Sequence, residues 1–368
     1  MKTLLQATLG AVVVSLSALP AAAQDTPPSG LRNRTIAYAL SGGHWAIHQT
    51  PDGKAECPQG VNPTGPRESF KALFPNLGPV GETQLAREAA AQFPMDKDEP
   101  FTFNEAGGKV GLGLNLDGKV DANDFTSPDG KVTGIDNQLF RVLGCVRFFR
   151  GPDGIGYHFT DVYLRQNNFN RALIELTNVD SLVDDPDVDV SVYRGMDTLM
   201  TDATGAKLIP GGLQRIDTKF GKKYESHFKG KIVGGVLITE PTDLYWPFAW
   251  FGGQPGTQHW LQTRFQMNLT EEGARGLVAG FTPVDTWYYG LIRGRSQYHL
   301  GTGTASSPLI YQAMRRLADG YPNEKGEMTA LSFAFDLPMV QVFIEHPDKA
   351  VASNAGEVQK SDRAPSRE

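Results

Sequence analysis

The segment between residues 113 and 125 carries side chains of the kind that bind hard cations. Calcium takes about six to eight oxygen ligands, and calcium loops supply them from alternating positions of a short glycine-containing turn. Loop positions 3, 5, 7, 9 and 12 hold Asn115, Asp117, the Lys119 carbonyl, Asp121 and Asp124. Gly118 stands where such a loop turns sharply. The spacing therefore predicts a calcium-binding loop.

This loop resembles those of EF-hand and dockerin-type calcium proteins, and the resemblance implies calcium as the cofactor. It departs from their pattern at the first position, where Gly113 stands in place of an aspartate. Because calcium affinity follows the charge of the ligands, we expect a dissociation constant on the order of 10⁻⁴ to 10⁻³ M. The alternative is a turn cluster whose Asp and Asn side chains accept hydrogen bonds from their own backbone.

An aromatic stretch between residues 245 and 260 holds Trp246, Trp250 and Trp260. On an exposed loop these rings would stack on a small-molecule or carbohydrate ligand, whereas buried rings would fill a core. Aromatic side chains are more often buried than exposed, but the glycines and proline between residues 252 and 256 allow an exposed loop. We therefore take the three tryptophans as candidate ligand-binding residues and keep the core as the alternative.

Catalytic motifs are scarce, so the catalytic residues stay unknown from the sequence. Neither Gly-x-Ser-x-Gly nor His-Glu-x-x-His occurs in the chain. A hydrolytic site would have to form from residues that meet only in three dimensions. The candidates are His259, His299, Asp243 and Ser296.

The two cysteines, Cys57 and Cys145, predict a structural disulfide bond, because an exported protein meets an oxidising compartment. Export itself is indicated by residues 1–23. Lys2 supplies a positive charge, residues 4–19 are mostly apolar, and three alanines precede the expected cleavage site after Ala23. We expect a periplasmic or secreted protein with no transmembrane segment after cleavage, because no later stretch is long and apolar enough to span a bilayer.

Composition narrows the class of protein. The formal net charge is −6 and the 35 basic residues are spread along the chain, which argues against nucleic-acid binding. With 41 glycines and 24 prolines, the chain favours many short strands joined by turns.

From residue 156 onward, short alternating runs bounded by turn residues predict antiparallel strands. In one of them, residues 331, 333, 335 and 337 are all apolar and fall on one face. A helix is expected from Ser307, with Pro308 in its first turn and Gly320 just past its end, and it should pack on a sheet. The predicted fold is mainly β (α+β), with an antiparallel, sandwich-like body and a few short helices.

The predicted organisation has four parts: a signal peptide (1–23), an N-terminal unit with the disulfide and the Asp-rich loop (24–155), a β-rich unit (156–345) and a disordered tail (346–368). Two functions fit these features. The first is an exported, non-catalytic binding or envelope-associated protein with a calcium-stabilised loop. The second is an exported hydrolase, which a histidine, an acid and a hydroxyl within hydrogen-bond reach would favour.

Overall fold

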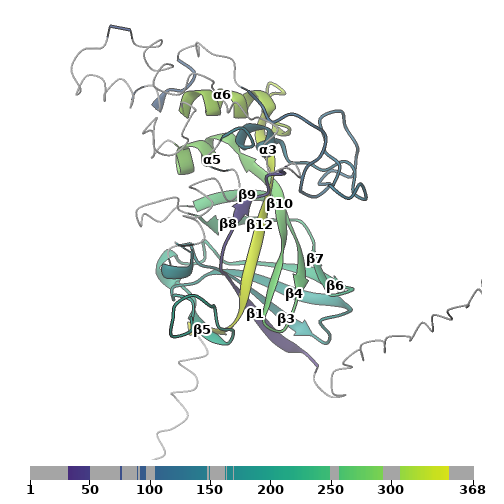
Figure 1. The fold of residues 1–368 in the computed structure, drawn as a ribbon, viewed down its shortest axis with the longest axis vertical. Helices are drawn as coiled ribbons and strands as arrows, with labels where there is room; N and C mark the ends of the chain where they lie inside the picture. Colours follow the sequence, from purple (N-terminus) through teal and green to yellow (C-terminus); the bar gives the residue numbers. More distant parts are fainter. Residues whose placement is uncertain are drawn as a thin grey trace, which may run out of the picture. The chain divides into compact units, whose positions relative to one another are not determined.

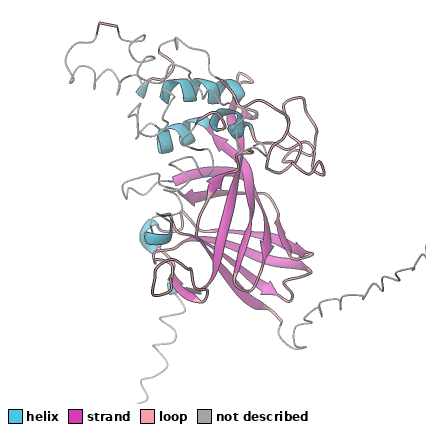
Figure 2. Cartoon of the chain, in the orientation of Figure 1, coloured by secondary structure: helices cyan, strands magenta, loops and turns pink. Residues whose placement is uncertain are grey.

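The computed structural model describes residues 32–49, 75–76, 89, 92–96, 104–146, 149, 162, 164–168, 170–248, 257–292 and 307–347. The predicted signal peptide and Cys57, Trp250, Ser296 and His299 lie outside these residues. Within them the structure is mainly β, with a few short helices, as the sequence predicts (Figure 2).

Eight strands form a closed antiparallel barrel in which sequential strands are neighbours (Figure 1). They are β1 (Arg34–Leu40), β3 (Ala172–Val179), β4 (Asp185–Arg194), β6 (Ser226–Val233), β7 (Val236–Thr239), β9 (Thr257–Leu269), β10 (Gly273–Pro283) and β12 (Met328–Glu345). The ring closes where β12 pairs with β1, with Ala37 opposite Val342. The sandwich-like prediction is therefore wrong. The first and last strands pair with each other, so the sheet closes into a barrel instead of dividing into two packed layers.

Four shorter strands pair with the barrel strands. They are β2 (His44–Trp45), β5 (Gly212–Arg215), β8 (Thr242–Pro247) and β11 (Gly320–Pro322). Three of them pair with β12, while β8 pairs with β9. Because β1 lies between β3 and β12, strands from both predicted units, 24–155 and 156–345, belong to one barrel.

Helices lie at one end of the barrel (Figure 1). They are α3 (Gln138–Leu143), α5 (Val284–Trp287), the π-helical turn η3 (Tyr288–Ile292) and α6 (Ser307–Leu317), while the short turn η2 (Thr218–Phe220) lies elsewhere. The predicted helix from Ser307 is confirmed as α6, and its apolar residues Ile310 and Met314 join the main core with Leu331 of β12. None of the helices described has the length and apolar composition needed to span a bilayer.

Alternate residues of the strands fill the barrel interior. On β12 the four predicted apolar residues point inward and are at most 1% exposed: Leu331, Phe333, Phe335 and Leu337. On β9 the inward residues change phase, from Gln258 and Trp260 to Thr263 and Phe265. A β-bulge explains the change, because Gln262 has a φ of 46° and the register with β10 shifts there. The bulge keeps both halves of this long strand facing the interior.

Candidate functional site

The side chains of the calcium-like loop hydrogen bond to its own backbone. The Gly118 amide donates to Asn115 Oδ1 at 2.6 Å, and the Lys119 amide donates to Asp117 Oδ1 at 2.8 Å. The Asp121 amide donates to Asp124 Oδ2. Gly118 adopts a φ of +78°, as the sharp turn requires. These contacts are those of the alternative interpretation, a turn cluster that caps itself.

Other parts of the protein hold this loop in place. Arg264 Nη1 donates to the Leu116 carbonyl at 2.8 Å, while within the loop the Lys119 carbonyl accepts a hydrogen bond from Asn115 Nδ2 at 2.7 Å. Among the residues that the structure describes, no three or more His, Cys, Asp or Glu side chains are grouped so that they could hold a metal ion. Calcium binding by Asn115, Asp117, Lys119, Asp121 and Asp124 stays a prediction.

Five residues beside this loop form what we call the polar hub: Asp136, Asn137, Gln138, Asp319 and Ser332. Asn137 caps α3 by accepting from the Phe140 amide, and its Nδ2 donates to the carbonyls of Leu112 at 2.8 Å and Ala46 at 3.1 Å.

The remaining hub contacts join the loop to the barrel. Asp136 Oδ2 accepts from the Leu116 amide at 2.6 Å. The Gln138 amide donates to Ser332 Oγ at 2.9 Å, and Ser332 Oγ donates in turn to Asp319 Oδ2 at 2.5 Å. Burial raises the pKa of Asp136 to about 6, and burial together with the charge of Asp136 raises the pKa of Asp319 to about 6. The hub therefore connects the Asp-rich loop and α3 to β12.

Two of the candidate ligand-binding tryptophans, Trp246 and Trp260, lie inside the barrel. Both are 0% exposed, and their rings stack with centroids 4.9 Å apart. They therefore fill the core, which is the alternative interpretation, and do not form an exposed platform. The reason is the pairing of β8 with β9, which turns both rings toward the interior. Trp250 lies outside the described residues.

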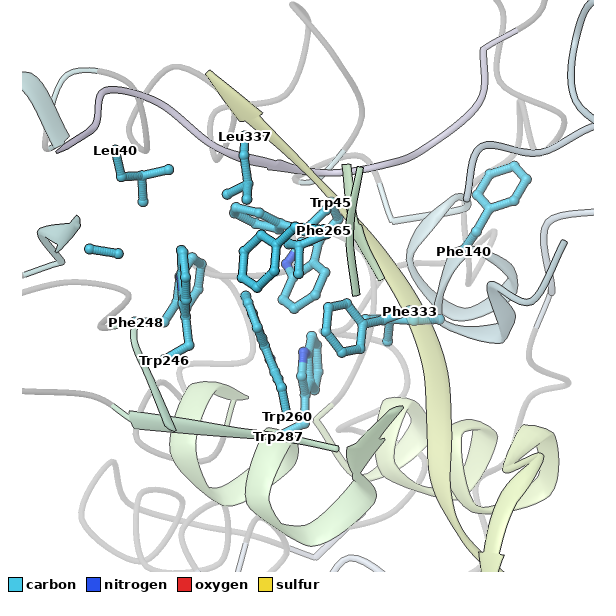
Figure 3. Packing of buried hydrophobic residues seen from close by; sticks show 14 of the residues in the cluster. Leu40, Trp45, Phe140, Trp246, Phe248, Trp260, Phe265, Trp287, Phe333 and Leu337 are labelled. Carbon is cyan, nitrogen blue, oxygen red and sulfur yellow. The ribbon is translucent and has the colours of Figure 1, made fainter. Parts of the chain in front are cut away.

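The structure adds two tryptophans that the sequence did not single out. Trp45 of β2 and Trp287 of α5 lie with ring centroids 5.9 Å apart, and Trp45 also contacts Phe335 at 5.1 Å. Trp260 contacts Phe333 at 4.7 Å. Figure 3 shows Trp45, Trp260, Trp287 and Phe333 gathered beside β12. We call this cluster the aromatic end; it consists of Trp45, Trp246, Phe248, Trp260, Trp287, Phe333 and Phe335.

The polar atoms of this region lack hydrogen-bond partners. In the part of the chain that the structure describes, eleven buried side-chain nitrogen or oxygen atoms have no partner, and eight of them lie at or next to the aromatic end. These eight are the four indole Nε1 atoms of Trp45, Trp246, Trp260 and Trp287, both amide atoms of Gln258, and the hydroxyls of Thr263 and Thr282. Gln258 lies opposite Trp246 in the β8–β9 pair. Thr263 lies beside Gly280, which is opposite Phe333 in the β10–β12 pair, and Thr282 follows two residues farther along β10.

Unpartnered atoms in this number are costly. Each buried polar group without a partner destabilises a protein by about 1–3 kcal/mol, whereas a whole domain is stable by only about 5–15 kcal/mol. An indole N–H that points at an aromatic face recovers a fraction of the lost hydrogen-bond energy. The Gln258 amide does not recover it in this way, because it needs conventional donors and acceptors. The aromatic end is therefore suited to a molecule that completes these hydrogen bonds.

A second group of polar residues lies on the outer face of the barrel. Ser191 of β4 and His227 of β6 are directly opposite each other in the sheet, and Ser191 Oγ lies 2.8 Å from His227 Nδ1. His227 Nε2 lies 2.9 Å from Glu225 Oε1. A hydroxyl, an imidazole and a carboxylate thus form one continuous chain of hydrogen bonds. Sequence reasoning missed it because 36 residues separate Ser191 from His227 and no motif surrounds either one.

The hydrolase candidates named from the sequence do not form such a chain. His259 stacks on Tyr245 with ring centroids 4.5 Å apart, and Asp243 Oδ1 accepts from the Gln262 amide at 2.8 Å. His299 and Ser296 lie outside the described residues.

Cys145 is fully buried in the main core, next to α3. Its predicted partner, Cys57, lies outside the described residues, so the disulfide stays a prediction. Comparison of the chain with protein-family models, curated proteins and solved structures gives no match.

Proposed function

We propose that this chain is an exported binding protein that holds one small, neutral, oxygen-bearing aromatic molecule at the aromatic end of its barrel. The single observation that carries this proposal is the set of eight buried polar atoms without partners. Eight-stranded barrels have interiors that side chains fill or that hold one small ligand, so the architecture suits this function.

The donors and acceptors at this end define the ligand. An indole N–H can only donate, and four of the eight atoms are indole nitrogens. The ligand must therefore be rich in acceptors such as carbonyl or ether oxygens. None of the eight atoms belongs to a charged side chain, and burying a charge without a counterion is costly, so the ligand is neutral. The surrounding rings favour a flat aromatic body.

A matched pair of probes tests the proposal: 2-acetylnaphthalene, which carries a carbonyl, and 2-ethylnaphthalene, which does not. Both are titrated by calorimetry and by tryptophan fluorescence. The ketone should bind about tenfold more tightly or better, because one buried hydrogen bond to an otherwise unpartnered donor is worth about 1.5 kcal/mol. Equal affinities, or no binding of either probe, would show that the buried atoms are satisfied in another way.

Two variants locate the binding site. Trp287→Phe removes an indole N–H and keeps an aromatic ring, so it should weaken the ketone more than the hydrocarbon. His259→Gln is the control, because His259 stacks on Tyr245 away from the interior and should leave both affinities unchanged.

Export belongs to the same proposal and is supported by residues 1–23 of the sequence. The protein isolated from its native host should begin at Gln24 and should gain two free thiols only after reduction. A soluble form that keeps Met1 would contradict cleavage, and thiols that react without reduction would contradict the Cys57–Cys145 disulfide.

A further inference from the structure

We propose that Ser191, His227 and Glu225 form a second site, on the outer face of the barrel, that hydrolyses small activated esters. This site is independent of the aromatic end, because inward and outward residues alternate along β4 and β6. On β4, Val190 and Val192 belong to the interior core, and Ser191 between them faces outward.

The sheet register fixes the reacting groups. Ser191 and His227 are Cα partners in the β4–β6 pair, so their side chains emerge side by side from rigid strands. Glu225 precedes His227 by two residues, and its Oε1 lies 2.9 Å from His227 Nε2. Nucleophile, base and orienting carboxylate thus have the hydrogen-bond connectivity that an activated serine requires.

The carboxylate determines which imidazole nitrogen acts as the base. Glu225 accepts a hydrogen bond from the Nε2 proton of His227, and this tautomer leaves the Nδ1 lone pair facing Ser191 Oγ at 2.8 Å. Glu225 is therefore a positioning residue, whereas Ser191 and His227 take part in the proton transfer.

The reaction balances with water alone. As Ser191 Oγ attacks the ester carbonyl, His227 Nδ1 takes the hydroxyl proton and then gives it to the departing alcohol, which leaves an acyl-serine. Water attacks the acyl carbon, His227 takes a proton from that water and returns it to Ser191 Oγ, and the carboxylic acid is released. The products are one alcohol and one acid, and no oxidant or reductant takes part.

Tyr193 supplies a donor for the negative charge that develops on the carbonyl oxygen. Tyr193 lies two residues from Ser191 on the same face of β4, and burial raises the pKa of its hydroxyl, so it keeps its proton. Its ring meets those of His227 and His346 edge-on, with centroids 6.0 and 5.6 Å away. The neighbouring Glu175 Oε1 is engaged by His346 Nε2 at 2.9 Å.

The exposure of the three residues limits the substrate. The side chain of His227 is 57% exposed and that of Glu225 is 32% exposed, but Ser191 is only 8% exposed. Only a small acyl group can reach Ser191 Oγ beside the imidazole. Because the Tyr193 hydroxyl is the one donor assigned to the developing negative charge, the substrate must also carry a good leaving group. Aryl acetates meet both conditions.

The test uses p-nitrophenyl acetate hydrolysis and labelling by a fluorophosphonate, with the labelled residue identified by mass spectrometry. The wild-type protein should carry the label on Ser191. Ser191→Ala should reduce hydrolysis to the level of the uncatalysed reaction, and His227→Gln should lower kcat/KM by about 100-fold or more, as expected for loss of a general base.

Glu225→Gln gives a readout that a merely structural role would not produce. Removing the carboxylate that orients His227 should lower kcat about tenfold while KM stays unchanged, because proton transfer is impaired but the substrate contacts are kept. Ser226→Ala is the matched control, because it changes the serine next to His227 and leaves the hydrogen-bonded chain intact.

A wild-type rate equal to the uncatalysed rate, or a folded Ser191→Ala protein as active as the wild type, would overturn the proposal. If Ser191→Ala does not fold, Ser191→Cys keeps the size of the side chain and should form an acetyl thioester with p-nitrophenyl acetate. A folded Ser191→Cys protein without that adduct would also overturn it. Naphthyl ketone binding is measured in the same samples, so failure of this proposal is distinguishable from failure of the proposed binding function.

Discussion

The polar hub and the aromatic end both bury polar side chains, but they complete their hydrogen bonds differently. In the hub, Asn137 alone makes three hydrogen bonds within the protein, and Ser332 both accepts and donates. At the aromatic end, eight atoms have no partner among the described residues. Polar groups that satisfy one another stabilise a fold, whereas unsatisfied ones need an external molecule. The comparison supports a structural role for the hub and agrees with the binding role proposed for the aromatic end.

The largest expected effect comes from the hub. Asn137→Ala removes three hydrogen bonds and takes the donor away from the buried Ala46 carbonyl and the partly buried Leu112 carbonyl, so the free energy of unfolding should fall by about 3 kcal/mol or more. Urea denaturation measures the change. Asn123→Ala, an exposed position in the neighbouring loop, is the control and should change stability by less than about 0.5 kcal/mol. Similar losses for both variants would remove the distinction.

The hub should also respond to pH. The pKa of Asp319 is about 6 in the folded protein, above its ordinary value of 3.8, so the folded state holds more protons between these values. Stability contributed by this group is therefore full below pH 4 and is lost as the pH rises through 6. Asp319→Asn should reduce that loss by on the order of 1–2 kcal/mol between pH 4 and 7. Parallel stability–pH curves for variant and wild type would contradict it.

At the aromatic end, removing a buried polar side chain should raise the free energy of unfolding instead of lowering it. Gln258→Met keeps the volume of the side chain and removes two unpartnered atoms, so the ligand-free protein should gain about 1 kcal/mol of stability. The affinity for the naphthyl ketone should fall at the same time. A loss of stability comparable to that of Asn137→Ala would show that Gln258 belongs to a satisfied network.

The smallest expected effect concerns the loop beside the hub. With a calcium dissociation constant of about 10⁻³ M, 1 mM calcium should stabilise the chelator-treated protein by only about 0.4 kcal/mol. Asp117→Ala should abolish this response in thermal unfolding, and Asp202→Ala, in a self-capping turn elsewhere in the chain, should not. If calcium changes nothing, the self-capping contacts of Asn115, Asp117 and Asp124 are the complete explanation of the loop.

Local patterns were sufficient for several elements. The helix from Ser307 and the inward row from Leu331 to Leu337 follow from a capping residue and from a two-residue period, which neighbours in sequence specify. The loop residues from Asn115 to Asp124 were found for the same reason. What the loop side chains bind was not decided locally, because an Asx turn and a calcium loop use the same residues.

By itself the sequence determined a mainly β protein with alternating strands, one C-terminal helix and an Asp-rich turn. Only the tertiary structure decided that the sheet closes, because closure depends on β1 pairing with β12 about three hundred residues later. It also decided that Trp246 and Trp260 face inward, and that Ser191 meets His227. These contacts depend on the register between paired strands, and a strand's own residues do not specify which residue lies opposite on its partner.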